Sequence, residues 1–213
     1  MNVINIRGTT GSGKTTIIRN LMANYQFSQA LTISEGVVGH YSKDMALIGP
    51  YKEGSNFGGV DAIKKISYVK PAILKALTLR PIVIFEGLLI SHSYERWLDF
   101  SKALQLLQEK AGEAPTGLIM CFITPSFREN IRRLRQRNNV KGSLREAKGD
   151  KYISNFISRY KSICRIRTKA VNESHITARV LNPYGPYGDL NFLLKSSIIR
   201  KNPALLKGLT NAR

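Results

Sequence analysis

Short runs of apolar residues alternate along the chain with stretches in which apolar residues recur at helical spacing. The runs have the length and composition of buried strands and cover Val3–Ile6, Ala30–Ser34, Ile82–Phe85, Leu118–Ile123 and Ile176–Leu181. The helical patterns cover Lys14–Tyr25, Ala62–Thr78, Ser93–Lys110, Phe127–Arg137, Tyr152–Asn172 and Leu190–Ile199. Because strands that alternate with helices form βαβ crossovers, we expect an α/β three-layer sandwich. Its sheet would be five-stranded and mainly parallel, with helices on both faces.

Two segments interrupt this alternation. Gly36–Gly59 is rich in glycine and aromatic residues and shows little periodicity. Loops of such length inside a compact domain are usually functional. Asn138–Gly149 carries mixed charge between two basic helices, which indicates a mobile lid over about residues 135–150. The chain has no internal repeat and no low-complexity tract, so we expect residues 1–213 to form one domain.

The first apolar run leads directly into a glycine-rich loop that satisfies the pattern G-x-x-x-x-G-K-[S/T]. Strand, glycine-rich turn and helix in this order form a cradle for the phosphates of a nucleoside triphosphate, because backbone N–H groups and a helix N-terminus converge on the anion. We expect Lys14 to reach the β- and γ-phosphates and the hydroxyl of Thr15 to hold Mg²⁺. The predicted phosphate-binding residues are Gly8, Thr9, Thr10, Gly11, Ser12, Gly13, Lys14, Thr15 and Thr16.

A carboxylate ends the apolar run at Ile82–Phe85. In proteins with a phosphate-binding loop, an acid at the end of such a strand faces the magnesium ion. Glu86 is therefore the predicted second metal-side residue, together with Thr15. Many buried strands end in an acid, so this pattern gains its meaning from the loop that precedes it.

Transfer of a phosphoryl group to a hydroxyl also needs a carboxylate that orients the acceptor and takes its proton. Asp61 follows the paired glycines Gly58 and Gly59, which allow the backbone to approach a ligand closely. An aspartate at this position also suits the N-cap of the helix predicted to follow, and the two roles are compatible. The residues alone leave Glu35, Asp44 and Glu86 as competitors for the catalytic role.

Arginines are concentrated before the predicted lid. Arg128, Arg132 and Arg135 lie on one helical face, and Arg133 and Arg137 on another. Guanidinium groups on a closing lid stabilise charge on a transferring phosphoryl group. We expect Arg133 and Arg137 to act on the triphosphate, and the others to form a solvated face or to contact nucleic-acid phosphates. The loop Asn182–Gly188 is expected to border the adenine, whereas the three histidines form no recognisable cluster.

The charge of the chain is unevenly distributed. The net charge is +19, of which residues 1–125 contribute +4 and residues 126–213 contribute +15. A kinase of small metabolites has no need of such an excess, so the basic half indicates a polyanionic partner, with nucleic acid as the first candidate. A solvated cationic surface is the alternative.

Other bulk features are ordinary. No apolar run is long enough to span a bilayer, and the N-terminus enters a predicted strand at once, so we expect a cytoplasmic protein with no membrane partner. The two cysteines lie far apart without ligand-like neighbours, so neither a disulfide framework nor a zinc site is expected.

The combination of motifs resembles phosphate-loop kinases of the nucleotide-kinase and polynucleotide-kinase type. The resemblance rests on Gly8–Thr15, on the strand ending at Glu86 and on the arginine-rich lid around residues 132–148. It implies a P-loop kinase fold with ATP as donor and Mg²⁺ as cofactor.

Two finer features resemble bacteriophage kinases that phosphorylate 5-hydroxymethyluracil within DNA. These are Leu47–Tyr51 with Gly58–Asp61, and Ile84–Ser91. This resemblance makes Asp61 the first choice for the base. In that family Cys and Thr commonly flank the aspartate, whereas this chain has Val60 and Ala62 there. Alternative functions are a nucleoside or nucleoside-monophosphate kinase, a polynucleotide 5′-hydroxyl kinase and a nucleic-acid-binding ATPase.

Overall fold

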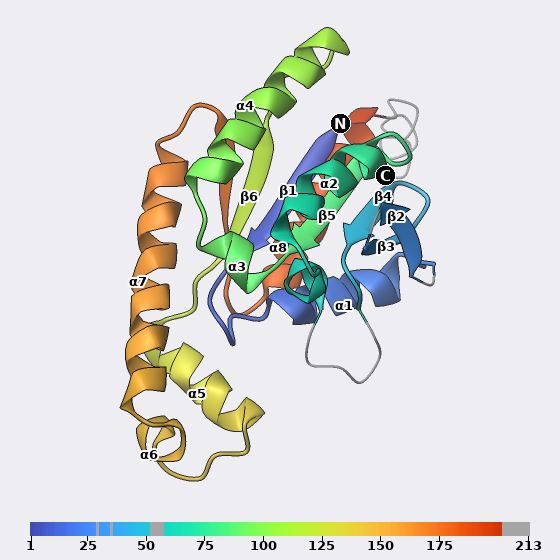
Figure 1. The fold of residues 1–213 in the computed structure, drawn as a ribbon. Helices are drawn as coiled ribbons and strands as arrows, with labels where there is room; N and C mark the ends of the chain where they lie inside the picture. Colours follow the sequence, from blue (N-terminus) through green and yellow to red (C-terminus); the bar gives the residue numbers. More distant parts are fainter. Residues whose placement is uncertain (29, 35, 52–57, 202–213) are drawn as a thin grey trace, which may run out of the picture.

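A seven-stranded sheet forms the centre of the protein in the computed structural model, which describes all residues except 29, 35, 52–57 and 202–213 (Figure 1). Its spatial order is β2-β3-β4-β5-β1-β6-β7. The strands are β1 (Asn2–Arg7), β2 (Leu31–Ser34), β3 (Val37–Tyr41), β4 (Met45–Ile48), β5 (Ile82–Glu86), β6 (Leu118–Ile123) and β7 (Ile176–Leu181). β4, β5, β1, β6 and β7 pair in parallel, whereas β2 and β3 add an antiparallel edge.

The predicted count of five strands is therefore wrong. The two additional strands, β3 and β4, both fall in Gly36–Gly59, which was expected to be a loop. They are only five and four residues long, and a tight turn in which Ser42 N–H donates to the Met45 carbonyl at 2.9 Å joins them. The run Met45–Ile48 is fully buried and is the strand that pairs in parallel with β5. The predicted strand at 30–34 lies instead at the antiparallel edge.

Helices cover both faces of the sheet, as the alternating pattern predicts. Their bounds are α1 (Lys14–Asn24), α2 (Val69–Leu77), α3 (Leu88–Ser91), α4 (Glu95–Lys110), α5 (Phe127–Arg137), α6 (Leu144–Lys148), α7 (Asp150–Val171) and α8 (Pro186–Lys201), with 3₁₀ helices at Gly59–Ala62 and Ile66–Tyr68. Apolar residues of α2, α4 and α7 pack in one core cluster, and those of α1 and α8 pack in a second cluster on the opposite face. Val3 contributes to the first cluster and Ile4 to the second, because successive strand residues point to opposite faces.

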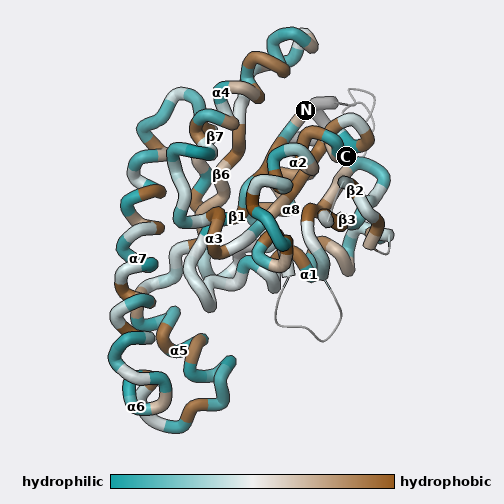
Figure 2. The backbone as a smooth tube through the Cα atoms, viewed as in Figure 1, coloured by the Kyte–Doolittle hydropathy of each residue, from teal (hydrophilic) through white to brown (hydrophobic). Residues whose placement is uncertain are grey.

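A third, smaller core joins α5, α6 and the start of α7, which extend away from the sheet (Figures 1 and 2). Leu134, Leu144, Ile153 and Phe156 are its buried members. The predicted lid at Asn138–Gly149 thus contains a short helix, α6, that Ser143 and Glu146 begin with reciprocal hydrogen bonds to the backbone. Leu144 anchors it to this small core.

The predicted helix at Ala62–Thr78 is wrong in its first half. One 3₁₀ helix ends at Ala62 and a second covers Ile66–Tyr68 before α2 begins at Val69. Elsewhere the agreement is closer, since α5 begins and ends where predicted. Within the described part of the chain, no helix has both the length and the hydropathy required to cross a membrane.

Candidate active site

The loop at Gly8–Thr15 connects β1 to α1 at the carboxyl edge of the parallel strands. Gly11 and Gly13 have φ angles of 77° and 100°, a region that glycine adopts without steric cost. Gly13 precedes the first residue of α1, so the loop ends at a helix N-terminus. A side chain at Gly8 would lie 2.7 Å from the Ile123 carbonyl, which shows how tightly the loop packs at the end of β6. The predicted order of strand, loop and helix is confirmed.

Lys14 folds back over this loop. Its Nζ donates to the carbonyls of Gly8 at 2.9 Å and Thr9 at 3.0 Å, and its side chain is buried. Burial lowers the pKa of Lys14, whereas Glu86 and Asp61 oppose that shift. The two carboxylates predicted from sequence are therefore the acids whose charge acts on this ammonium group.

Glu86 ends β5, next to Ile6 of β1 in the sheet register. The Thr15 hydroxyl donates to its Oε1 at 3.2 Å, so the two predicted metal-side residues are adjacent. Glu86 is 2% exposed, and burial raises its pKa to about 7. Lys14 and the Thr15 hydrogen bond act in the opposite direction, while Asp61 raises the pKa further.

Asp61 lies in the first 3₁₀ helix and is exposed to solvent. Its carboxylate accepts hydrogen bonds from two backbone N–H groups at the start of α3, those of Leu88 and Leu89, the latter at 3.0 Å. The expected capping of the helix that follows Asp61 in sequence is wrong, because the carboxylate caps α3 instead. Each carboxylate oxygen thereby accepts one backbone hydrogen bond, while the residue as a whole stays exposed.

Two glycines allow the carboxylates to come together. A Cβ at Gly87 would lie 2.8 Å from Asp61 Oδ1, and a Cβ at Gly59 would lie 2.8 Å from Glu86 Oε1. Gly59 also has a φ of 73°, so a larger residue there would be strained as well as crowded. Of the glycine pair singled out from the sequence, Gly59 therefore serves close packing against the end of β5, whereas a Cβ at Gly58 would meet Tyr51 instead.

The competing acids are placed differently. Asp44 lies between β3 and β4, and its carbonyl accepts from Ile82 N at the opposite end of β5 from Glu86. It is therefore separated from the loop by the length of the sheet. Glu35 lies outside the described residues.

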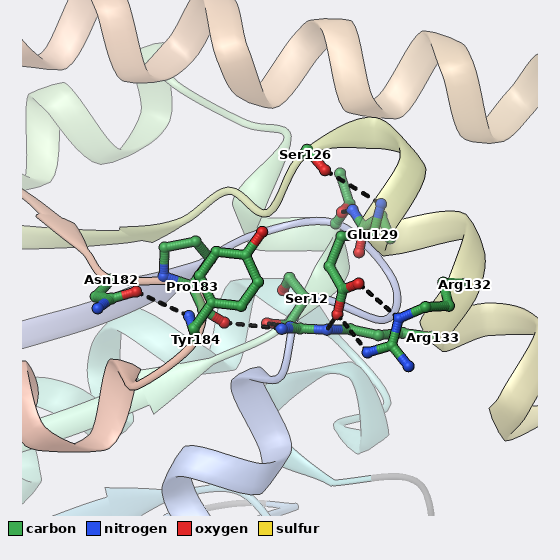
Figure 3. A network of polar contacts seen from close by, with 10 residues as sticks. Ser12, Ser126, Glu129, Arg132, Arg133, Asn182, Pro183 and Tyr184 are labelled. Atoms are coloured by element: carbon green, nitrogen blue, oxygen red, sulfur yellow. Dashed lines mark hydrogen bonds and ion pairs between the residues drawn. The ribbon is translucent and has the colours of Figure 1, made fainter.

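Arg133 of α5 joins three segments around the loop (Figure 3). Its guanidinium donates to the Ser12 carbonyl at 3.2 Å and to the Pro183 carbonyl at 2.8 Å, and its Nε donates to Glu129 at 2.7 Å. The loop after β7, expected to border a nucleotide base, is thus held beside the glycine-rich loop. Arg137 is exposed, and its charge lowers the pKa of Lys14.

The remaining arginines of α5 are solvent-exposed. They are Arg128, Arg132 and Arg135. Arg132 forms a bidentate pair with Glu129 at 2.6 and 2.7 Å, the same carboxylate that holds Arg133. Glu129 thereby orders two neighbouring guanidinium groups, one over the loop and one in solvent. Its pKa is lowered to about 2, first through the hydrogen bonds from Arg132 and Arg133.

Sequence reasoning missed two residues through which α5 packs on the loop. Asn130 is fully buried and donates from Nδ2 to the Thr9 hydroxyl at 2.5 Å. Leu134, one turn later, would contact any side chain at Gly11. The sequence did contain a signal, since Asn130 and Leu134 lie four positions apart on one face of a basic helix. Only the fold shows that both contact the glycine-rich loop.

His92 is the third omission. It follows α3, and burial lowers its pKa to about 4, with Arg159, Lys14 and Arg7 adding to the shift. Arg7 is buried and donates to the carbonyls of Ser91 at 3.5 Å and Ser93 at 3.1 Å, on either side of this histidine. No other histidine is near, so the sequence offered no cluster by which to find it.

The arrangement brings four features to one edge of the sheet: a glycine-rich loop that ends at a helix N-terminus, a lysine, a hydroxyl–carboxylate pair and a second carboxylate. Glu86 is enclosed, whereas Asp61 is accessible. Within the described residues, no group of three or more His, Cys, Asp or Glu side chains could hold a metal by itself. Any cation here would complete its coordination with other oxygens, which is how Mg²⁺ binds beside phosphates.

Comparison with known proteins supplies relatives of this chain. No protein-family model matches it. A protein of Pseudomonas phage M6 named "5-hmdU DNA kinase" is 29% identical over 182 residues, which cover 80% of this chain and 86% of the relative. A second protein with that name, from Pseudomonas phage PaMx11, is 33% identical over 101 residues, 44% of this chain and 52% of the relative. The resemblance inferred from the motifs is confirmed: this chain is similar to one phage protein named 5-hmdU DNA kinase along most of its length, and to a second along less than half of it.

Proposed function

We propose that this protein is an ATP-dependent kinase that transfers the γ-phosphate to the hydroxymethyl group of 5-hydroxymethyluracil in DNA. The observation that carries the proposal is the similarity to two phage proteins named 5-hmdU DNA kinase, one of which matches 80% of this chain. The site geometry is consistent with it, since each type of group required for phosphoryl transfer lies at the same edge of the sheet.

The donor would bind at the P-loop. Backbone N–H groups of Gly8–Thr16 would hold the phosphates, and Lys14 would leave the carbonyls of Gly8 and Thr9 to reach the β- and γ-phosphates. Those two carbonyls keep the ammonium group over the loop until an anion replaces them. The adenine would lie towards the loop that contains Pro183, which Arg133 holds beside Ser12.

Mg²⁺ fits the Thr15–Glu86 pair. Both side chains offer oxygen ligands, and the 3.2 Å between Thr15 Oγ1 and Glu86 Oε1 is compatible with a shared ion or an ion and its water. When bound, the ion would neutralise charge on the phosphates. Its charge would also favour the ionised form of Glu86, whose pKa is otherwise raised to about 7 by burial.

Asp61 would be the base. The hydroxymethyl oxygen attacks the γ-phosphorus, the bond from that phosphorus to the bridging β–γ oxygen breaks, and ADP leaves. The hydroxyl proton passes to the Asp61 carboxylate. Hydrogen bonds from Leu88 and Leu89 hold the carboxylate in one orientation, which favours alignment of the acceptor.

The residues at 135–150, together with α5, would act as the lid of a single kinase domain. Arg133 and Arg137 would then stabilise the charge of the transferring phosphoryl group. Arg133 already contacts the P-loop through Ser12, and Arg137 is close enough to influence Lys14. The basic surface of the C-terminal half would hold the DNA backbone while the target base leaves the stack.

The test is transfer of label from γ-labelled ATP to four acceptors: hydroxymethyluracil DNA, the free nucleoside, its monophosphate and a 5′-hydroxyl oligonucleotide with ordinary bases. We expect label on the base of the first acceptor alone. Label only on the free nucleoside or its monophosphate would make the protein a nucleoside or nucleotide kinase. Label on the oligonucleotide end would make it a 5′-kinase. ATP hydrolysis without a labelled acceptor would indicate an ATPase.

A further inference from the structure

The short helix α3 presents an apolar side chain to solvent beside the proposed base. We propose that Leu89 is a wedge that enters the base stack of duplex DNA when the target nucleotide is extruded, so that the protein accepts its substrate in duplex form. This inference rests on the proposed function and assigns a role that the phosphoryl-transfer chemistry does not itself require.

The position of Leu89 is set by a direct contact with Asp61. Its N–H donates to Asp61 Oδ1 at 3.0 Å. A nucleotide whose hydroxymethyl group reaches Asp61 would therefore lie close to the start of α3, where Leu89 is exposed. The gap that an extruded base leaves in the duplex would then lie within reach of this side chain, which is where DNA-distorting proteins place apolar wedges.

Leu89 is 62% exposed, although its neighbours in α3 are covered. Ile90 is fully buried and Leu88 is half-buried. A single exposed leucine is common on protein surfaces and needs no explanation by itself. Here the exposed position is the one next to the proposed acceptor site, on an element whose other apolar side chains contribute to packing.

A wedge has to be held rigidly, and α3 is fixed at both ends. Asp61 caps its first two N–H groups. At the other end Arg7, which is buried, donates to the carbonyls of Ser91 and Ser93. The Ser91 hydroxyl donates to the Gly87 carbonyl at 2.6 Å, which ties the last residue of the helix to its start. A helix of four residues has little stability of its own, so these bonds define its conformation.

The surroundings of α3 suit a DNA backbone. Arg159, an exposed residue of α7, lies near enough to His92 to contribute to the lowered pKa of that imidazole, after the larger effect of burial. His92 therefore stays neutral near pH 7, while the arginine supplies a cation on the α7 side. Charge complementarity thus favours nucleic acid over a protein segment as the occupant.

The experiment compares hydroxymethyluracil in three contexts: a matched duplex, a duplex in which the base opposite is missing, and a single strand. We expect Leu89→Ala to lower kcat/KM on the matched duplex by roughly tenfold or more. Without the leucine side chain, no apolar group would fill the gap that the extruded base leaves in the stack. On the single strand the change should be under about twofold, since no paired stack has to be opened. Leu89→Met, which restores an apolar side chain of similar length, should recover duplex activity.

A direct readout accompanies the rates. With 2-aminopurine placed next to the target, wild-type protein should raise the fluorescence of the duplex, and Leu89→Ala should not. The matched control is Leu106→Ala on α4, a leucine that is 60% exposed and lies outside the site, for which all three contexts should be unchanged. Leu89→Ala and Leu89→Met both retain helix-favouring residues.

The outcomes separate this inference from the function on which it rests. Equal losses on duplex and single strand, or no loss on either, would overturn the wedge while leaving the kinase assignment intact. A wild-type protein that phosphorylates only the single strand would overturn it too. Failure of the wild-type protein to label any hydroxymethyluracil DNA would instead refute the proposed function.

Discussion

The hydroxyl of Thr15 donates to Oε1 of Glu86 at 3.2 Å, joining the first turn of α1 to the last residue of β5. The two residues are 71 positions apart. They meet because β1 and β5 are parallel neighbours in the sheet, so the residues that follow one strand lie beside the end of the other. Both the donor and the metal side of the proposed reaction depend on this pairing.

Lys14→Ala should abolish phosphoryl transfer. The ammonium group lies over the glycine-rich loop, where its Nζ donates to the carbonyls of Gly8 and Thr9, and it is the cation proposed to reach the γ-phosphate. We expect a loss of kcat of at least about a hundredfold, typical of removing a preorganised charge at the transferring group. The circular-dichroism spectrum should match that of wild type. Near-normal turnover in a folded variant would exclude this loop as the donor site.

Asp61→Asn should lower kcat by roughly a hundredfold or more with little change in KM for ATP, since the proposed proton acceptor is lost and the glycine-rich loop is untouched. Loss of one capping bond to α3 should destabilise the protein by only about 1 kcal/mol. Asp44→Asn is the matched control, because Asp44 lies at the far end of β5, and it should retain normal kcat. Normal kcat for Asp61→Asn together with a lowered kcat for Asp44→Asn would show that Asp61 is not the base.

Glu86 should make the stability of the ligand-free protein fall as pH rises. Its pKa is about 7 in the folded state and 4.5 for the ordinary group, so between these values the folded protein binds more protons than the unfolded chain. The free energy of unfolding of wild type, measured relative to Glu86→Gln, should therefore decrease by roughly 3 kcal/mol from pH 4.5 to 7. Urea titrations at several pH values measure this difference.

His92 acts with the opposite sign. Its pKa is lowered to about 4 from 6.5, so the unfolded chain binds more protons between these values and stability rises with pH. Because His92 is present in both proteins, its contribution cancels in the comparison of wild type with Glu86→Gln. Parallel stability curves for the two proteins would show that the Glu86 pKa is not raised. Saturating Mg²⁺ and ATP should reduce the dependence on Glu86, since a bound cation favours its charged form.

Arg133→Ala should lower kcat/KM for ATP by about tenfold to a hundredfold, because it removes the guanidinium that joins Ser12 of the glycine-rich loop to Pro183. Arg132→Ala is the matched control, since Arg132 binds the same Glu129 but points into solvent. Steady-state kinetics should show a change of under about threefold for the control, in line with the small effect of exposed ion pairs. Equal losses of kcat/KM in the two variants would show that the pairing with Glu129, and not the contact of Arg133 with the loop, is needed for activity.

DNA affinity should fall steeply with salt. The logarithm of the binding constant should decrease linearly with the logarithm of salt concentration, by about 0.9 per phosphate contact. Replacing two exposed lysines with alanine, Lys141 before α6 and Lys148 at its last position, should reduce that slope by about 1 to 2. Replacing the exposed Lys102 and Lys110 of α4 should leave it unchanged. Fluorescence anisotropy of a labelled duplex measures the slope for wild type and for both variants. An identical slope for all three proteins would show that Lys141 and Lys148 of the basic C-terminal half do not contact DNA phosphates.

Local sequence determined those features that depend on local chemistry. The strand, loop and helix around Gly8–Thr15 follow from an apolar run, glycines that permit positive φ, and a helical pattern. α5 begins at Phe127 because the Ser126 side chain accepts from Glu129 N–H, a signal that is contained in four consecutive residues. Both the type and the position of such elements were predictable because the deciding contacts lie within a few residues of one another.

Tertiary structure decided which distant residues meet. β3 and β4 were missed because they are short and lie in a glycine-rich segment, and only pairing with β5 stabilises Met45–Ile48 as a buried strand. Asp61 caps a helix that is 27 residues distant instead of the one that follows it, and Asn130 reaches Thr9 across 121 positions. The sequence alone determined the residue types proposed for phosphoryl transfer. Only the parallel sheet brings Lys14, Glu86 and Asp61 to one edge. Contacts between residues so far apart in sequence form through chain topology and not through local propensity.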